Sequence, residues 1–210
     1  MNIARLTPSF AMQYRTLMLQ AYAGNPDAFT STVAERSALP LSWWENRLSV
    51  TQNPIELVFA ALEDGQLLGT AGLSFDAREK VSHKSTLFGM YVAPAHRGCG
   101  IGHQLVCAAL DCARARSGIK LVQLTVTQGN HKAEELYGRC GFVQFGVEPF
   151  AVAVGDGFVS KVHMWCDLNA ANGSNGLVER TAASCADQNF KDVGRPLAVM
   201  TNTLNSNSQA

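Results

Sequence analysis

The 210-residue sequence has no net charge and no long apolar run. Seventeen Lys and Arg residues balance seventeen Asp and Glu residues, and no hydrophobic stretch reaches the length of about 18 residues that a membrane-spanning helix needs. A balanced charge argues against nucleic acid as a main partner, because binding to a phosphate backbone uses a basic surface. With 47% hydrophobic residues, the chain is expected to bury a sizeable core in water, with no membrane partner.

Paired cysteine motifs and metal-ligand spacings are missing as well. The sequence has six cysteines but no C-x-x-C pair, and its five histidines show no spacing typical of a metal site. Free thiols are therefore expected rather than disulfides or zinc. The chain starts directly with a short predicted strand, Asn2-Ile3-Ala4-Arg5-Leu6, where a secreted protein would carry a signal peptide. These features predict a cytoplasmic protein without a metal.

A glycine-rich segment is the strongest functional signal in the sequence. A strand-like run, Leu87 to Val92, leads through a turn into Arg97-Gly98-Cys99-Gly100-Ile101-Gly102, where an apolar stripe at helical spacing begins. Glycines allow a ligand to approach closely, so N–H groups at the helix start can bind phosphate oxygens, with Arg97 adding positive charge. A Walker A loop would need Gly-Lys-Ser/Thr, and a Rossmann fingerprint would need glycine where His103 stands. The segment predicts a pyrophosphate site of another kind, unless its glycines serve packing alone.

A second motif lies downstream of the glycine-rich segment. The strand-like run Leu121 to Val126 is followed by Asn130, a helical stretch to Cys140, and Gly141-Phe142. Asn130 and Tyr137 lie nearly two helical turns apart, so both should face the same side of that helix. Together the two motifs resemble those of the GNAT superfamily of N-acetyltransferases. In that family the loop reads Arg/Gln-x-x-Gly-x-Gly/Ala, and an Asn opens a helix that carries Ala-x-x-x-Tyr and ends in Gly-Phe.

The resemblance implies a fold and a co-substrate. The fold would be the α/β (α+β) acyl-CoA N-acyltransferase fold, a central, mostly antiparallel mixed sheet flanked by helices, over residues 1–168. The co-substrate would be acetyl-CoA, with its pyrophosphate on the loop and its pantetheine along backbone groups of a bulged strand. Tyr137 would be the catalytic residue that assists departure of the thiolate. The cofactor-binding residues implied are Met90, Tyr91, Val92, Arg97, Gly98, Cys99, Gly100, Ile101, Gly102, Asn130, Ala133 and Tyr137.

The activity implied is transfer of an acetyl group to a primary amine of a small molecule, peptide or protein, by direct attack of the amine on the thioester. Glu35 is predicted as the catalytic base, with His83 and Glu148 as alternatives, because these ionisable residues lie near segments that flank the acceptor cleft in the family. Phe29 and the pair Trp43-Trp44 are candidates to line the acceptor pocket. Two other readings stay open: a non-catalytic module that binds or senses acyl-CoA, and a structural interaction domain.

Turn and capping signals predict the remaining elements. Thr7-Pro8 should begin a helix, residues 32–37 a second, and the capping-box spacing of Ser42-Trp43-Trp44-Glu45 a third. Asp64-Gly65 favours a type I′ turn between two strands, and residues 143–168 are typical of a final antiparallel pair.

The composition changes after residue 168. Residues 169–210 are small and polar with one aromatic residue, Phe190, which predicts a mobile C-terminal tail. The alternative is an arm that packs on a second subunit and makes a homodimer. Its contacts would be Leu177, Val178, Phe190 and Leu197.

Overall fold

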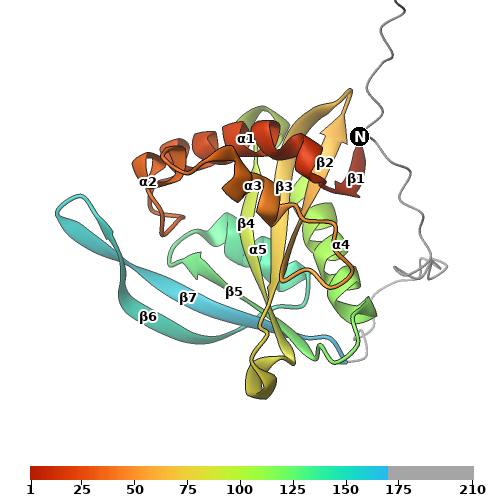
Figure 1. The fold of residues 1–210 in the computed structure, drawn as a ribbon. Coiled ribbons are helices and arrows are strands. Elements are labelled where there is room, and N and C mark those ends of the chain that lie inside the picture. Colours follow the sequence, from red (N-terminus) through yellow and green to blue (C-terminus); the bar gives the residue numbers. More distant parts are fainter. Residues whose placement is uncertain (170–210) are drawn as a thin grey trace, which may run out of the picture.

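The computed structural model describes residues 1–169, which form a seven-stranded sheet with helices on both faces (Figure 1). In chain order the elements are β1 (Asn2–Arg5), the 3-10 turn η1 (Pro8–Phe10), α1 (Ala11–Gly24), α2 (Val33–Ser37), α3 (Leu41–Arg47), β2 (Glu56–Glu63), β3 (Gln66–Phe75), η2 (Glu79–Val81), β4 (Lys84–Val92), η3 (Pro94–His96), α4 (Ile101–Ala115), β5 (Leu121–Thr127), α5 (His131–Arg139), β6 (Val143–Val154) and β7 (Gly157–Asp167).

The sheet has the order β1-β2-β3-β4-β5-β7-β6. Every neighbouring pair is antiparallel except β4 and β5, which run parallel. The predicted mixed, mostly antiparallel sheet flanked by helices is therefore confirmed. No helix within residues 1–169 is long and apolar enough to cross a lipid bilayer. The predicted tail beyond residue 169, together with its proposed arm contacts, lies outside the described residues.

Two hydrophobic clusters lie on opposite faces of the sheet. The α4 cluster combines the apolar stripe of α4 with inward residues of β5 and with Tyr137 of α5. The α1 cluster is built on the other face from α1, α3 and parts of β2 and β4. In α1 the buried residues Tyr14, Met18 and Tyr22 follow at four-residue intervals, so they form one stripe along the helix.

Local signals explain two short connections and correct one prediction. The hairpin between β2 and β3 turns at Asp64 (φ 48°) and Gly65 (φ 79°), as the predicted type I′ turn requires. The predicted capping box at Ser42 is wrong, because α3 starts at Leu41 after Pro40 and Ser42 lies inside the helix. A capping box occurs instead at α2, where the Thr32 side chain accepts from the Glu35 N–H and the Glu35 carboxylate accepts from the Thr32 N–H.

The sheet divides at β4 and β5, and this division positions the candidate site. These strands pair only through residues 84–86 and 121–123, and β5 then continues beside β7 alone. Between β3 and β4 the register shifts, with Thr70 opposite Tyr91 but Gly72 opposite Phe88. Gly89 and Met90 therefore form a bulge, with Gly89 at φ 58°. The later part of β4 has no strand beside it on the β5 side.

Candidate active site

The loop from η3 to α4 presents a row of backbone N–H groups without acceptors. Gly98 (φ 82°) and Gly100 (φ 76°) turn the chain into α4, and the Gln104 N–H is the first to bond back, to the carbonyl of Gly100. No acceptor within residues 1–169 serves the N–H groups of residues 98–103. Unpaired amides at a helix N-terminus, where the dipole is positive, are suited to bind a phosphate or pyrophosphate.

Side chains in this loop keep the amides accessible. Ile101 is buried in the α4 cluster, so only its backbone can face a ligand, and the Cys99 side chain is exposed. The Arg97 Nε donates to the Val92 carbonyl oxygen over 2.9 Å, which ties the loop to the end of β4. A Cβ on Gly102 would lie 3.0 Å from Met90 Cε and 3.1 Å from a Leu136 methyl carbon. Glycine at 102 therefore lets α4, α5 and the β4 bulge come together.

The β4 bulge faces both sides of the sheet. The side chain of Met90 packs with the α4 cluster beside the glycine loop. Gly89 lies on the other face, where it lines a pocket and where a Cβ would be 3.8 Å from Tyr14 Oη. Tyr91 is buried in the α1 cluster, whereas Val92 packs against the α4 cluster. The side chains of Met90, Tyr91 and Val92 thus have packing roles, and the backbone is what remains available for a ligand.

The predicted Asn–Tyr helix forms as α5, beside α4. Asn130 Oδ1 accepts from the Ala133 N–H at 3.3 Å and so caps α5. Tyr137 is 7% exposed, and its ring meets Phe142 edge to face at a centroid distance of 5.8 Å. Its hydroxyl has no hydrogen bond within residues 1–169, and burial raises the pKa of Tyr137 above its usual value of 10. The phenol therefore stays protonated and able to donate.

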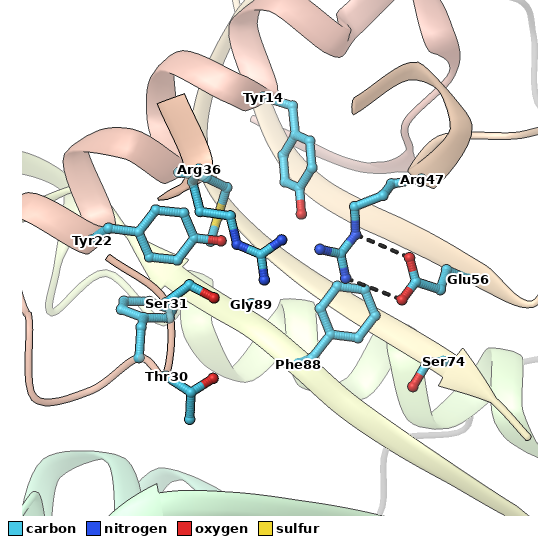
Figure 2. Close-up of a pocket in the computed structure, with 12 residues that line it drawn as sticks. Tyr14, Tyr22, Thr30, Ser31, Arg36, Arg47, Glu56, Ser74, Phe88 and Gly89 are labelled. Atoms are coloured by element: carbon cyan, nitrogen blue, oxygen red, sulfur yellow. Dashed lines mark hydrogen bonds and ion pairs between the residues drawn. The ribbon is translucent and has the colours of Figure 1, made fainter. Parts of the chain in front are cut away.

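A pocket of about 250 Å³ lies on the face of the sheet that carries the α1 cluster (Figure 2). Aromatic and charged side chains share its wall, contributed by the first three helices, the loop between α1 and α2, and three strands. The lining residues are Tyr14, Met18, Tyr22, Phe29, Thr30, Ser31, Arg36, Arg47, Glu56, Ser74, Phe88 and Gly89. Because Gly89 belongs to both the pocket wall and the β4 bulge, the pocket lies next to the strand that separates it from the glycine loop.

Two arginines give this pocket a positive charge. Figure 2 shows the guanidinium groups of Arg36 and Arg47 turned toward each other across the pocket. Arg47 pairs with Glu56 at 3.0 and 3.1 Å, whereas Arg36 has no carboxylate partner within residues 1–169. Both guanidinium carbons lie 4.7 Å from the centre of the Trp43 ring, so Trp43 supports the two cations. One carboxylate facing two guanidinium groups leaves one positive charge in the pocket.

The three ionisable residues considered as base lie outside the pocket lining. Glu35 is exposed, and its hydrogen bonds to Thr32 lower the pKa of its carboxyl, which weakens it as a base. Glu148 on β6 contacts His163 on β7, with 3.0 Å between Glu148 Oε2 and His163 Nε2. His83 lies before β4, where its carbonyl accepts from the Lys120 N–H. These contacts favour structural roles, above all for Glu35 in the capping box of α2.

Sequence reasoning identified one wall of the pocket and missed its charges. Phe29 lines the pocket, while Trp44 is fully buried in the α1 cluster. Arg36, Arg47 and Glu56 gave no signal, because single charged residues on short helices are usually solvated. Tyr14, Met18 and Tyr22 of α1 line the pocket as well, and the first two lie beside Gly89 of β4.

Comparison with known proteins gives a consistent family. The profile described as "Acetyltransferase (GNAT) family" matches residues 18–142. A streptothricin acetyltransferase of Streptomyces lavendulae is 40% identical over 85 residues, which cover 40% of this chain and 43% of that protein. A spermidine N(1)-acetyltransferase of Vibrio cholerae is 38% identical over 72 residues, 33% of this chain and 42% of that protein. The matches thus span less than half of either curated relative.

Solved structures share the fold over a larger part of the chain. An acetyltransferase of the GNAT family from Streptococcus pneumoniae superposes with a TM-score of 0.72 at 22% identity, covering 78% of this chain and 97% of that one. A putative acetyltransferase from Salmonella typhimurium, solved with its cofactor acetyl-CoA, has a TM-score of 0.65 at 19% identity. The match covers 87% of this chain and 99% of that one. At these identities the likeness concerns the fold.

Proposed function

This chain belongs to the GNAT family of acetyltransferases, and we propose that it transfers an acetyl group from acetyl-CoA to a primary amine by direct attack. The observation that carries the proposal is the position of the β4 bulge. On one side of the sheet it meets the loop of unpaired amides, and on the other it meets the pocket. A long ligand bound at the loop can therefore extend along β4 and present its reactive end to a second molecule in the pocket.

The residues present fit acetyl-CoA. The unpaired N–H groups of residues 98–103 would hold the pyrophosphate, with Arg97 beside them. The pantetheine would lie along the free edge of residues 90–92 of β4, close to Asn130 and Ala133 at the start of α5. Acetyl-CoA supplies the acetyl group as a thioester, and no metal ion is part of this proposal.

The chain's own groups would act on the two ends of the thioester. A backbone N–H at the β4 bulge would donate to the thioester carbonyl oxygen, where negative charge develops as the amine attacks. The Tyr137 hydroxyl, which has no partner within residues 1–169, would donate to the sulfur as the C–S bond breaks. Sulfur leaves with the bonding electrons, and the attacking nitrogen loses its proton to solvent.

The charge of the pocket indicates the class of acceptor. Arg36 has no carboxylate partner within residues 1–169 and faces Arg47 across the pocket. A bound anionic group would relieve this repulsion and accept charge-assisted hydrogen bonds. Phe29 and Phe88 offer apolar surface nearby. We therefore propose an acceptor that carries a carboxylate or similar anion beside its primary amine, as an α-amino acid does.

The positive charge of the pocket also affects whether the acceptor amine needs a base to remove its proton. Nearby cations disfavour an ammonium group, so they lower the pKa of an amine bound in the pocket. The acceptor's own carboxylate, once paired with the guanidinium groups, no longer favours the ammonium form, so more of the amine is neutral in the pocket than in water. The proposal needs no strong base at Glu35. A cytoplasmic location is part of the proposal.

A matched pair of acceptors tests this function. Purified protein would be assayed for release of CoA thiol with an apolar α-amino acid and with its carboxamide. We expect kcat/KM to favour the acid by about 10-fold or more, as loss of a charge-assisted hydrogen bond predicts. The carboxamide makes its amine less basic, so a preference for the acid cannot arise from a larger neutral fraction. Arg36→Met should abolish the preference, and Arg36→Lys should restore part of it.

The control is Arg114→Met, which removes an arginine from α4, on the opposite face of the sheet. It should keep the preference for the acid. Equal turnover of acid and carboxamide by the wild type would contradict the acceptor class while leaving acetyl transfer intact. Binding of acetyl-CoA without release of thiol to amino acids, polyamines or peptides would favour the non-catalytic alternative.

A further inference from the structure

Three metal-ligating side chains meet where α4 contacts α5, apart from the proposed acceptor pocket. His103 and Cys107 are one turn apart on α4, and Cys140 follows the last residue of α5. One ligand atom from each lies within 4.8 Å of the other two. Cys107 Sγ is 3.6 Å from Nδ1 and 3.8 Å from Nε2 of His103. Spacing along the chain does not reveal this cluster, because the three ligands come together only when the two helices pack.

We propose that His103, Cys107 and Cys140 bind a thiophilic divalent metal ion such as Zn²⁺, with a fourth position open to solvent. Zn–S and Zn–N bonds of about 2.3 and 2.0 Å at a tetrahedral angle place sulfur and nitrogen about 3.5 Å apart. The observed separation of Cys107 Sγ and His103 Nδ1, 3.6 Å, is close to this value. Two thiolates and an imidazole are a donor set that zinc prefers over calcium or magnesium.

The two cysteine side chains lie in contact with each other, and their sulfurs would bind an ion as thiolates. When a divalent ion binds both sulfurs, two thiol protons in total pass to solvent, and the site as a whole becomes neutral.

The site is accessible, and its neighbours do not compete for the ion. His103 is exposed, which gives an ion a route from solvent. Asp111 lies one turn beyond Cys107 on α4, but its carboxylate pairs with Arg114 at 2.9 Å. Cys166 is buried on β7, with its Sγ 4.0 Å from the Cys140 carbonyl oxygen. An ion held by residues of both helices would tie the C-terminal end of α5 to the first two turns of α4.

The test begins with wild-type protein, freed of metal and kept reduced. Zn²⁺ would be titrated in competition with a chromophoric chelator, and Co²⁺ would be titrated in parallel. We expect one equivalent of Zn²⁺ to bind and to raise the thermal midpoint of unfolding, because an ion that binds only the folded state stabilises it. Co²⁺ should give sulfur-to-metal charge-transfer bands and the intense visible bands of tetrahedral coordination. These readouts need no variant and no activity.

Matched variants assign the ligands. We expect a loss of Zn²⁺ affinity of about 100-fold or more in each of three variants, His103→Gln, Cys107→Ser and Cys140→Ser. Removing a residue that coordinates the metal costs more affinity than removing a residue that only hydrogen-bonds to a ligand. His131→Gln removes an exposed histidine on α5, and Cys99→Ser removes an exposed thiol. Both controls should bind Zn²⁺ like the wild type.

Two results would overturn the proposal. The first is wild-type affinity for Zn²⁺ no higher than that of a Cys107→Ser, Cys140→Ser double variant, with octahedral Co²⁺ spectra. The second concerns the number of thiols that react in air-exposed protein. Four instead of six, with reductant restoring six and with no such reductant-dependent change in Cys107→Ser, would be that result. That count would assign the pair to a disulfide instead.

Discussion

Tyr137 is the single side chain on which the proposed chemistry depends most. Proton transfer from a phenol (pKa about 10) to a thiolate (pKa about 8.5) is uphill by about 2 kcal/mol, and burial raises the pKa of Tyr137 further. We therefore expect a hydrogen bond that strengthens as the C–S bond breaks. Tyr137→Phe keeps the ring contact with Phe142 and should lower kcat by about 10²- to 10⁴-fold, with the Kd for acetyl-CoA nearly unchanged.

Rapid-mixing kinetics and calorimetry would measure the two quantities separately. Because burial keeps the phenol protonated, the wild-type kcat should show no decline from ionisation of Tyr137 below about pH 10. Wild-type kcat in Tyr137→Phe, when chemistry limits the rate, would show that the hydroxyl is dispensable.

Gly100 and Gly118 form a natural matched pair. Both have positive φ, 76° and 87°, and a Cβ at either would meet no atom within 4 Å. Valine at either position should therefore cost about 1–2 kcal/mol of stability through backbone strain alone. Gly100→Val should also raise the Kd for acetyl-CoA sharply, because its side chain would block close approach of the ligand to the amides of the loop. Gly118→Val should leave that Kd as it is.

Calorimetry on both folded variants decides the point. Equal affinity for acetyl-CoA in wild type and Gly100→Val would remove the loop from the proposed site. A smaller loss, with weaker dependence on salt, is expected from Arg97→Ala, since it removes a charge but no amide.

At the scale of elements, one buried lysine holds a wall of the pocket. Lys161 Nζ on β7 donates to the carbonyls of Asp27 and Ala28 at 3.0 and 2.9 Å and to Thr127 Oγ1 at 2.7 Å. The loop fixed in this way continues into Phe29, which lines the pocket. These hydrogen bonds join the end of β5, at Thr127, to the loop that follows α1, and so connect the two parts of the molecule that separate at β4 and β5.

Lys161→Met should release this loop. It keeps the length of the side chain but removes a charge-assisted donor from two partly buried carbonyls, which should cost about 1–3 kcal/mol of unfolding free energy. We expect a higher KM for the acceptor and an unchanged Kd for acetyl-CoA. Lys80→Met, at an exposed lysine of η2, serves as the control in both assays. An unaltered acceptor KM in Lys161→Met would show that the loop does not shape the pocket.

Elements with local signals could be predicted from sequence, and contacts between distant elements could not. Asp64-Gly65 fixed its turn because few residue pairs accept positive φ in succession. The capping box at Ser42 was a wrong prediction, because Pro40 is the N-cap residue and α3 starts at Leu41. The turn into α4 could be predicted from its own glycines, of which Gly98 and Gly100 have positive φ. The meeting of Arg36 with Arg47, or of Cys107 with Cys140, depends on how helices pack, which spacing along the chain does not encode.

At the scale of the whole molecule, the C-terminal boundary can be tested by truncation. The Leu168 N–H donates to the Lys120 carbonyl at 3.0 Å, and Leu168 packs against the α4 cluster. A chain ending at Leu168 keeps these contacts, so we expect its thermal midpoint and its Kd for acetyl-CoA to match those of the full chain. Light scattering on both chains measures their masses. A change from dimer to monomer on truncation would favour the alternative in which the segment is an arm between subunits.

The placement of the two hydrophobic clusters has a consequence for how such a protein can diverge. The α4 cluster supports the loop and α5, while the α1 cluster supports the pocket, and the sheet lies between them. Arg36, the pocket arginine that has no carboxylate partner within residues 1–169, lies on the five-residue helix α2, which buries no residue and carries its own capping box. Substitutions on α2 therefore disturb little packing. Selection for a new acceptor can act there while the machinery for the common acyl donor is inherited unchanged.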